Sequence, residues 1–332
     1  MDVLVLGGTA WLGGEVARRG VSLGHTVTCL ARGESGPVPE GARLVVGDRS
    51  TTEAYAELEG RRFDLVVDVA RQPLHVRTAL DALGEHADHW VLVSTGSVYA
   101  DHASMHRTEA TSLLPAFEGD EAPPELYGEA KVACEQACRA VRGDDVLIAR
   151  SGLIAGAGDP SDRAGYWPGR FALAAEDGGP VLVPERRDVP CQLTDVRDLA
   201  GWLLEAGLAA EVGTMNAVAP ERRLEEVLDA AAAVAGFAGE RVPMSDDALR
   251  EAGVEEYMGP RSLPLWIADP EWAGFQSLDD TLARDAGLTA RPVEDTLAAA
   301  LAWERELGLA RTGRRAGLDR DDELALLGVS RD

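Results

Sequence analysis

The chain has 332 residues, 45% of them apolar and 27% charged, which is typical of a soluble globular protein with room for two domains. Its formal net charge of −25 repels phosphate backbones and anionic membrane surfaces, so we expect no nucleic-acid or membrane partner. No apolar run approaches the roughly 18 residues of a membrane span, and Asp2 and Gly7 bound a short N-terminal apolar stretch unlike a secretory signal. The four cysteines show neither CxxC spacing nor a disulfide framework, which favours a reducing cytoplasm.

Short apolar runs alternate with helical patterns in the first half of the chain, which predicts an α/β fold with a parallel sheet and crossover helices. The predicted strands are residues 3–6, 25–30, 42–46, 63–69, 90–94 and 146–148, and the predicted helices are 15–23, 74–83 and 125–141. Residues 152–169 and 177–190 are rich in Gly, Pro and Asp and are predicted to form loops. Further on we predict a strand at 214–218, helices at 223–235, 245–252, 277–286 and 293–307, and a tail (311–332) that packs as a short helix on the body or on a partner.

A glycine-rich turn directly follows the first predicted strand. Its spacing is G-x-x-A-x-x-G, with Gly7, Ala10 and Gly13 at the three small positions. Such a turn leads into a helix whose unpaired N–H groups can bind a pyrophosphate. An ordinary loop is the alternative, but the position after a buried strand favours dinucleotide binding.

The residues after the second and third strands bear on the type of dinucleotide. An acidic residue after the second strand would bind the ribose 2′-OH of NAD, whereas the strand here ends with Arg32. A guanidinium suits the 2′-phosphate of NADP, so NADP is preferred in our prediction and NAD is the alternative. Asp48, after the third strand, is placed to meet the adenine, although a plain turn Asp would occupy the same position.

Tyr127 and Lys131 carry the strongest catalytic signal. Of the 32 Lys and Arg residues only Lys131 is a lysine, and it stands four residues after Tyr127, on the same face of a predicted helix. A phenol has a pKa near 10, and a neighbouring ammonium lowers it toward the range useful for proton transfer. We therefore predict that Tyr127 is an acid/base catalyst and that Lys131 tunes it. Thr95 and Ser97, at the end of the fifth strand, are candidates to hydrogen-bond the same substrate oxygen.

These motifs resemble the short-chain dehydrogenase/reductase superfamily, in its extended or atypical, epimerase/dehydratase-like branch. The resemblance implies a Rossmann domain over residues 1–150, joined by about 190–220, and a smaller, mostly helical substrate lobe formed by 151–189 and 221–332, often in a homodimer. It implies that Thr95 is the hydroxyl partner of Tyr127 and that Lys131 also binds the nicotinamide ribose. The residues expected to bind the cofactor are Gly7, Thr9, Ala10, Trp11, Leu12, Gly13, Arg32, Asp48, Val69, Ala70, Arg71, Ser94, Tyr127, Lys131, Ser151, Gly152 and Leu153.

Several positions depart from the patterns of this family. Ala10 replaces the middle glycine, as in an atypical subgroup with a Gly-Gly-Thr turn. Gly96 and Ser97 stand where sugar 4,6-dehydratases carry an acidic pair, which argues against that reaction. Leu153 lies near the position where nucleotide-sugar epimerases usually carry an Asn, which disfavours a sugar nucleotide without eliminating it.

Other polar and aromatic groups receive weaker interpretations. His102 and His106 have no third ligand at suitable spacing, so we predict no metal site. Ser97, Tyr166 and Trp167 are candidates for the substrate pocket, the last two in a polar-aromatic cluster that could equally be a loop held by its own contacts. Trp266 fits the core of the second domain better than a substrate-stacking role.

The leading hypothesis is an NADP-preferring oxidoreductase that moves a hydride between the nicotinamide and a carbonyl or secondary alcohol of a small molecule. The first alternative is an epimerase of a sugar or nucleotide-sugar that uses bound NAD(P) for transient oxidation. The second is a non-catalytic, nucleotide-sensing or RNA-associated member of the superfamily, which the Tyr127–Lys131 pair and the acidic charge disfavour. These motifs do not identify the substrate.

Overall fold

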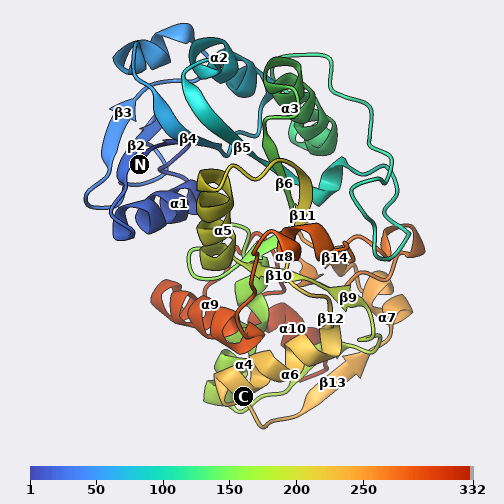
Figure 1. Ribbon diagram of the computed structural model, residues 1–332. Helices are drawn as coiled ribbons and strands as arrows, with labels where there is room; N and C mark the ends of the chain where they lie inside the picture. The colour runs from blue at the N-terminus through green and yellow to red at the C-terminus, as the bar shows by residue number, and fades with distance from the viewer. Residues whose placement is uncertain (330–332) are drawn as a thin grey trace.

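A seven-stranded parallel sheet, built mainly from the N-terminal half of the chain, forms one lobe of the computed structural model, which describes residues 1–329 (Figure 1). Its spatial order is β11-β6-β5-β4-β1-β2-β3, and every neighbouring pair is parallel. The strands are β1 (Asp2–Leu6), β2 (Thr26–Ala31), β3 (Arg43–Val46), β4 (Phe63–Asp68), β5 (Ala87–Thr95), β6 (Leu147–Ser151) and β11 (Gly213–Ala217). This is the doubly wound Rossmann order, in which the winding reverses between β1 and β4 and a ligand crevice opens outside the carboxyl ends of those strands. The predicted fold class is confirmed.

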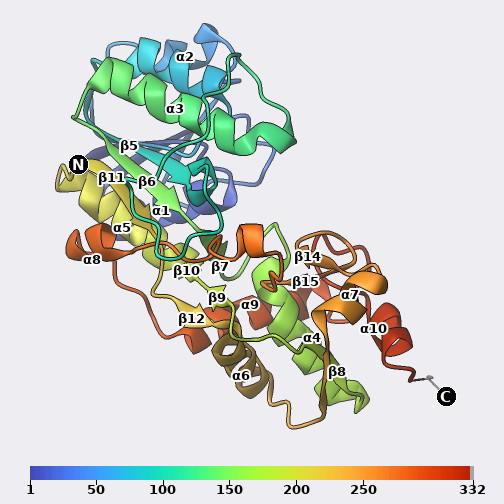
Figure 2. The same cartoon turned by 90° about the vertical axis from the view of Figure 1, so that its right-hand side faces the viewer.

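Helices cover both faces of this sheet (Figures 1 and 2). Helices α1 (Trp11–Ser22) and α5 (Val196–Leu208) pack together on one face, and α2 (Pro73–Leu83) and α3 (Tyr127–Arg142) pack together on the other. The strands read as continuous apolar runs because both of their faces are buried beneath these helices. We call the sheet with these four helices the sheet lobe.

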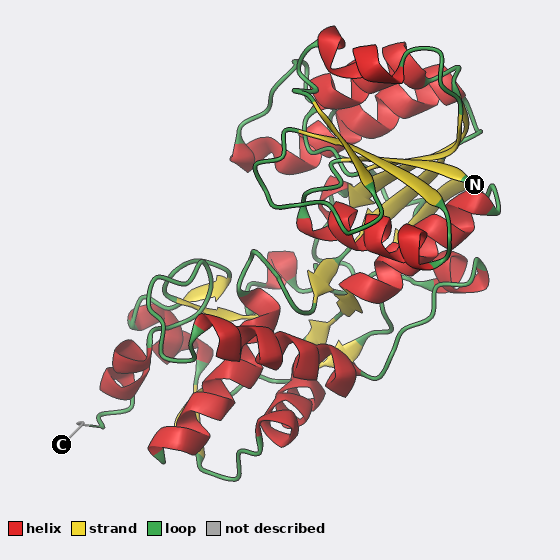
Figure 3. Ribbon diagram, turned by 90° about the vertical axis from the view of Figure 1, so that its left-hand side faces the viewer, coloured by secondary structure: helices red, strands yellow, loops and turns green. Residues whose placement is uncertain are grey.

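A second, mostly helical lobe lies beyond the sheet (Figure 3). Its core is formed where α4 (Arg163–Asp177), α6 (Leu224–Ala235) and α9 (Val293–Leu307) pack on one another. The remaining helices are α7 (Asp246–Glu251), α8 (Thr281–Asp285) and α10 (Arg320–Leu326), of which α8 contacts β11. Short strands pair as β7 (Leu153–Ala155) with β10 (Leu193–Asp195), β9 (Pro190–Cys191) with β12 (Arg222–Arg223), β8 (Val181–Pro184) with β13 (Arg241–Met244), and β14 (Glu255–Tyr257) with β15 (Ser262–Pro264).

Helix α4 corrects the prediction of a loop over residues 152–169. The helix begins at Arg163 and contains Pro168 together with Gly165 and Gly169, which are loop-favouring residue types. The two glycines allow α9 to approach closely, because a Cβ built on Gly165 would lie 2.5 Å from a carboxylate oxygen of Glu304. Tertiary packing therefore outweighs the local propensity.

Two other predicted helices differ from the structure at their ends. Helix α1 begins at Trp11, four residues earlier than predicted, and the helix predicted for 277–286 is confined to α8. Helix α5 was not predicted at all. Across the residues that the structure describes, no helix is long and apolar enough to cross a membrane.

Candidate active site

The turn after β1 has the geometry of a phosphate-binding turn. Gly7 has φ +98°, a conformation that L side chains rarely adopt, and the carbonyl of Gly7 accepts a hydrogen bond from Ala10 N at 3.0 Å. A Cβ on Gly13 would lie 2.3 Å from that same carbonyl oxygen, so this position accepts only glycine. Ala10 is the N-cap of α1, and the first turn of the helix carries no acidic residue. The helix therefore presents free N–H groups and a positive dipole end to an anion.

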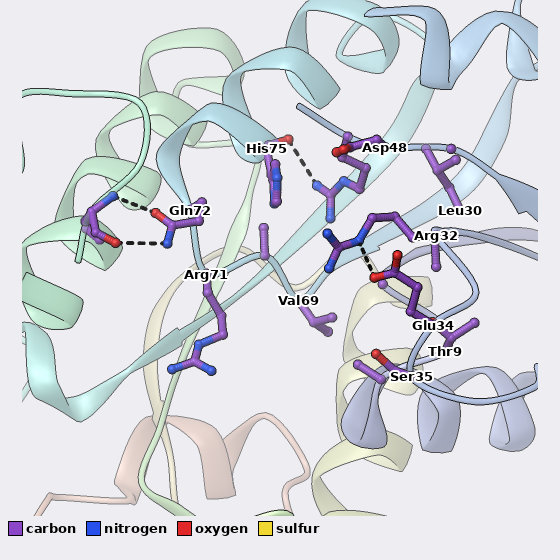
Figure 4. A pocket seen from close by; sticks show the side chains of 18 of the residues that line it. Thr9, Leu30, Arg32, Glu34, Ser35, Asp48, Val69, Arg71, Gln72 and His75 are labelled. Carbon is purple, nitrogen blue, oxygen red and sulfur yellow. Dashed lines mark hydrogen bonds and ion pairs between the residues drawn. The ribbon is translucent and has the colours of Figure 1, made fainter. Parts of the chain in front are cut away.

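A cavity of about 460 Å³ extends from this turn along the carboxyl ends of the strands (Figure 4). Its lining includes Gly7, Thr9, Ala10, Arg32, Asp48, Val69, Ala70, Arg71 and Tyr127, which are nine of the residues predicted to bind the cofactor. Arg32 lies at one end and Arg71 toward the other, as Figure 4 shows. The shape and the glycine turn fit an extended dinucleotide.

The Arg32 end of the cavity holds a carboxylate that the sequence reasoning missed. Arg32 Nε lies 3.3 Å from Glu34 Oε2, and both side chains line the cavity. Asp48 faces the same end, and a hydrogen bond from Ser50 N holds the pKa of its carboxyl below the usual value. A guanidinium for a 2′-phosphate and a carboxylate for a 2′-hydroxyl thus stand side by side.

The base of this cavity is held by a buried ion pair. Arg49 donates to both carboxylate oxygens of Asp68 at 2.9 Å, and the two side chains are 7% and 0% exposed. Arg49 also donates to the carbonyl of His75, whose own imidazole pKa is lowered chiefly by burial. Gln72 forms two hydrogen bonds with the backbone of Ala122, which place the loop before α3 over the cavity (Figure 4).

Tyr127 lies where this cavity meets a second one. It is the first residue of α3, it is half-buried, and its side chain lines both cavities. The guanidinium of Arg71 lies 5.2 Å from the centre of the Tyr127 ring. A phenol in this position can reach a ligand that occupies either cavity.

Lys131 is buried one turn further along α3. It is 2% exposed, and its ammonium donates to the carbonyl of Ala70 at 2.6 Å and to that of Val93. These carbonyls belong to β5 and to the residues just after β4. The lysine therefore connects α3 to the carboxyl ends of two inner strands of the sheet. Lys131 lines neither cavity, and its contact with a nicotinamide ribose therefore stays a prediction.

Thr95 and Ser97 lie beside Tyr127 at the end of β5. Thr95 Oγ1 accepts a hydrogen bond from Ser97 N at 3.2 Å and donates to Ser97 Oγ at 3.3 Å, and both side chains line the second cavity. Ser94 does not, which corrects its prediction as a cofactor ligand. Because side chains alternate along a strand, Ser94 points the other way and donates to Glu135 at 2.5 Å, within a buried pair of Glu135 and Arg150.

The second cavity, of about 860 Å³, runs from Tyr127 into the second lobe. Ser151, Gly152 and Leu153 line it, and their contact with a nicotinamide stays a prediction. Trp11 also lines it, and its indole N–H donates to the carbonyl of Ala157 at 2.7 Å. The cavity thus has polar side chains on the sheet lobe and a wall supplied by the second lobe.

The structure corrects two further site predictions. Tyr166 and Trp167 are 1% and 0% exposed and line neither cavity, because the buried face of α4 places them in the core of the second lobe. The Leu12 side chain packs beneath the sheet and Gly13 packs on the carbonyl of Gly7, so a contact of either residue with the cofactor stays a prediction for its backbone. Trp266 is fully buried in the second-lobe core, as predicted.

Several residues that line the cavities were not predicted from the sequence. They are Glu34 and Gln72 in the first cavity, and Trp272, Phe275 and Arg315 in the second. Only Glu34 was within reach of sequence reasoning, because it lies in the same loop as Arg32. Within residues 1–329, no group of three or more His, Cys, Asp or Glu side chains is placed to hold a metal ion.

The Rossmann order, the glycine turn and the two adjoining cavities are typical of a dinucleotide-binding fold joined to a second lobe. Residues 72–217 match the model of the NAD dependent epimerase/dehydratase family. The match covers less than half of the chain and agrees with the resemblance predicted from the sequence. A search of curated proteins found no match.

Solved structures share this fold at low sequence identity. A candidate epimerase from Burkholderia cenocepacia is 23% identical with a TM-score of 0.69, over 92% of this chain and 98% of that one. The WbmH enzyme of Bordetella bronchiseptica, in complex with NAD+, is 17% identical with a TM-score of 0.67, over 92% and 99%. UDP-glucuronic acid 4-epimerase from Bacillus cereus, in complex with NAD, is 14% identical with a TM-score of 0.66, also over 92% and 99%. At these identities the likeness concerns the fold.

Proposed function

We propose that the protein is an NADP-preferring oxidoreductase that interconverts a carbonyl and a secondary alcohol on a small molecule. The observation that carries the proposal is the position of Tyr127, which lines both cavities beside two hydroxyl side chains at the carboxyl edge of the sheet. A proton donor at the junction of a dinucleotide cavity and a substrate cavity is what carbonyl reduction requires.

Each residue of the site has a distinct role in this proposal. Tyr127 transfers a proton to or from the substrate oxygen, and Thr95 and Ser97 orient that oxygen by hydrogen bonds. Lys131 positions α3 against β5 and supplies a fixed positive charge under the site. The nicotinamide, when bound, supplies the hydride. The protein contributes orientation, proton transfer and exclusion of water.

The preference for NADP rests on Arg32. Its guanidinium stands at the end of the cavity expected to receive the adenosine ribose, where it can pair with a 2′-phosphate. Glu34 opposes this preference, because its carboxylate pairs with Arg32 and would repel the 2′-phosphate.

The test is a titration with NADPH and NADH that follows nicotinamide fluorescence. We expect tighter binding of NADPH by the parent protein, loss of that preference in Arg32→Ala, and a stronger preference in Glu34→Gln. Equal affinity of the parent protein for both nucleotides would refute the NADP assignment while leaving the catalytic proposal intact.

The redox reaction is tested by absorbance with NADPH and a panel of carbonyl compounds. The proposal predicts that one NADPH is consumed for each carbonyl reduced. Turnover that persists in Tyr127→Phe would remove this residue from its assigned role.

An epimerase is the second candidate, and the family match together with the size of the second cavity supports it. Structural neighbours named as UDP-sugar 4-epimerases have the same fold. Against a sugar-nucleotide substrate, the apolar Leu153 lines the cavity where such epimerases usually carry an Asn. An epimerase would isomerise its substrate with no net change in nicotinamide absorbance, so the same trace distinguishes the two reactions.

A non-catalytic, RNA-associated role is the third candidate, and the net charge of −25 argues against it. Filter binding to RNA at physiological salt tests it directly. A cytoplasmic location and a homodimer remain predictions from the sequence.

A further inference from the structure

Three segments that are distant in the sequence meet at the end of the second cavity that lies on the second lobe. They are the start of α4 with Arg163, strand β14 with Tyr257, and the C-terminal tail with Arg315. The tail contacts the loop after β14, since Gly259 and Ala316 form a parallel bridge. Two guanidinium groups of the second lobe thus line the same cavity as Tyr127 of the sheet lobe.

Arg163 is held in place by two neighbours. Its Nε donates to Ser161 Oγ at 3.1 Å, and its guanidinium lies 4.8 Å from the centre of the Tyr257 ring. Tyr257 has φ +66°, which is an uncommon and strained conformation for a bulky residue. Such strain persists only where the surroundings impose it, and it is frequent at ligand-binding positions.

Arg315 is placed by its backbone, which leaves its side chain available. Asp162 accepts a hydrogen bond from Arg315 N at 2.8 Å and another from Arg311 at 2.6 Å, so one carboxylate fixes this part of the tail. In the part of the chain that the structure describes, the Arg315 guanidinium has no hydrogen bond or ion pair, and it lines the cavity.

The carboxylates at this end are already engaged. Asp159 accepts hydrogen bonds from the backbone of Ser161 and Ala164, and burial raises the pKa of its carboxyl. Glu256 accepts from Ala268 N at 2.6 Å and from Asp269 N at 2.9 Å, and it also pairs with Arg250. Asp269 in turn accepts from the backbone of Glu271. The carboxylates therefore bind the backbone of the surrounding loops, and the guanidinium groups of Arg163 and Arg315 are available to bind a ligand.

We propose that Arg163 and Arg315 bind an anionic group, a phosphate or a carboxylate, on the substrate of this enzyme. This inference rests on the proposed function, because it takes the second cavity as the substrate cavity. The substrate is then an anion whose charged end lies in the second lobe and whose carbonyl or alcohol lies at Tyr127. Fork-shaped guanidinium groups suit both kinds of anion.

The experiment is calorimetric titration of the full chain, in the presence of saturating NADP+, with inorganic pyrophosphate and separately with citrate. The variants are the double substitution Arg163→Gln/Arg315→Gln and, as a matched control, Arg261→Gln. Arg261 lies in the same lobe and pairs with Asp322, but it does not line the cavity.

We expect at least one of the two anions to bind, with affinity about 10- to 100-fold weaker in the double variant and unchanged in the control. Pyrophosphate binding alone assigns a phosphate group to the substrate, and citrate binding alone assigns a carboxylate. Affinity that is unchanged in the double variant, or no binding of either anion, overturns the inference.

This outcome is independent of turnover. A chain that binds anions through the two arginines yet consumes no NADPH with any carbonyl would refute the proposed function and not the anion site. A chain that reduces carbonyls but binds no anion would refute only the site.

Discussion

The two lobes hold their parts of the site by different means. In the sheet lobe, Lys131, Thr95 and Gly7 are fixed by hydrogen bonds to or from the backbone at the ends of the strands. In the second lobe, the position of the tail depends on carboxylates that each contact two arginines. Glu304 pairs with Arg311 and Arg314, and Glu323 pairs with Arg170 and Arg320.

This difference suggests a division between reaction and recognition. Backbone hydrogen bonds hold the residues around the proposed acid/base group, because the sheet itself determines the geometry. Networks of charged side chains place the residues that would select a substrate, and they can change by substitution without disturbing the sheet. We expect variants in the sheet lobe to change turnover and variants in the second lobe to change stability and substrate affinity.

Tyr127→Phe is the largest expected effect and tests the catalytic side of this comparison. Removal of the phenol hydroxyl should lower turnover by about 10²- to 10⁴-fold, because proton transfer loses its group. Nicotinamide fluorescence should show unchanged dinucleotide affinity. A change in affinity with normal turnover would mean that Tyr127 serves binding only.

Glu304→Gln tests the ionic network of the second lobe. Its carboxylate is 2% exposed between two arginines, so its loss leaves buried positive charge uncompensated and should cost about 3–5 kcal/mol in free energy of unfolding. Urea denaturation measures this. Asp88→Asn is the control, since the Arg62–Asp88 pair is exposed and should contribute less than about 1 kcal/mol. If both substitutions changed the free energy of unfolding equally, the buried ion pairs of Glu304 would not be important for stability.

Gly13→Ala tests the backbone contacts of the sheet lobe. The added Cβ would approach the carbonyl of Gly7, so we expect a loss of about 1–3 kcal/mol and weaker dinucleotide binding. At Gly14, the next residue of α1, the nearest atom to an added Cβ lies 3.5 Å away, at an ordinary contact distance. Gly14→Ala should therefore stabilise the helix by roughly 0.5–1 kcal/mol. Destabilisation of both variants alike would show that the turn is not the cause.

The smallest effect concerns His102, where the two lobes touch. Its ring stacks on Trp272 with ring centres 4.5 Å apart, and burial, together with Arg107, lowers the pKa of His102 from 6.5 to about 4. Between these two pKa values the unfolded chain binds a proton at His102 that the folded chain does not. The stability that His102 contributes is therefore fully present above pH 6.5, and it declines as the pH falls toward 4.

His102→Gln should reduce the loss of stability between about pH 7 and about pH 5, as measured by urea midpoints at both values. His86→Gln, an exposed histidine of the sheet lobe, is the control. The same pH dependence in all three proteins would show that His102 does not contribute.

The sheet lobe was predictable because its signals are local. A four-residue apolar strand, a glycine turn and the spacing of Tyr127 and Lys131 each depend on neighbours in the sequence. The second lobe was less predictable because its structure depends on distant contacts. Helix α4 forms against α9 despite Pro168, and the same packing buries Tyr166 and Trp167, which the sequence alone suggested as pocket residues.

The site divides in the same way. The glycine turn, Arg32 and the hydroxyl residues Thr95 and Ser97 were predicted as site residues from their positions in the sequence alone. Arg315 could not be found, since only the fold brings residue 315 next to the loop before α4. Glu34 lies three residues beyond the end of β2, and only the structure shows that it pairs with Arg32.

Lys131 bears the single ε-amino group of the chain, and that group is 2% exposed beneath the site. Amine-reactive acylating reagents should therefore leave this amino group unmodified as long as α3 stays packed against the sheet. Its rate of acylation, followed by intact-protein mass spectrometry, becomes a direct measure of how often this helix opens, and of how far a bound dinucleotide suppresses that opening.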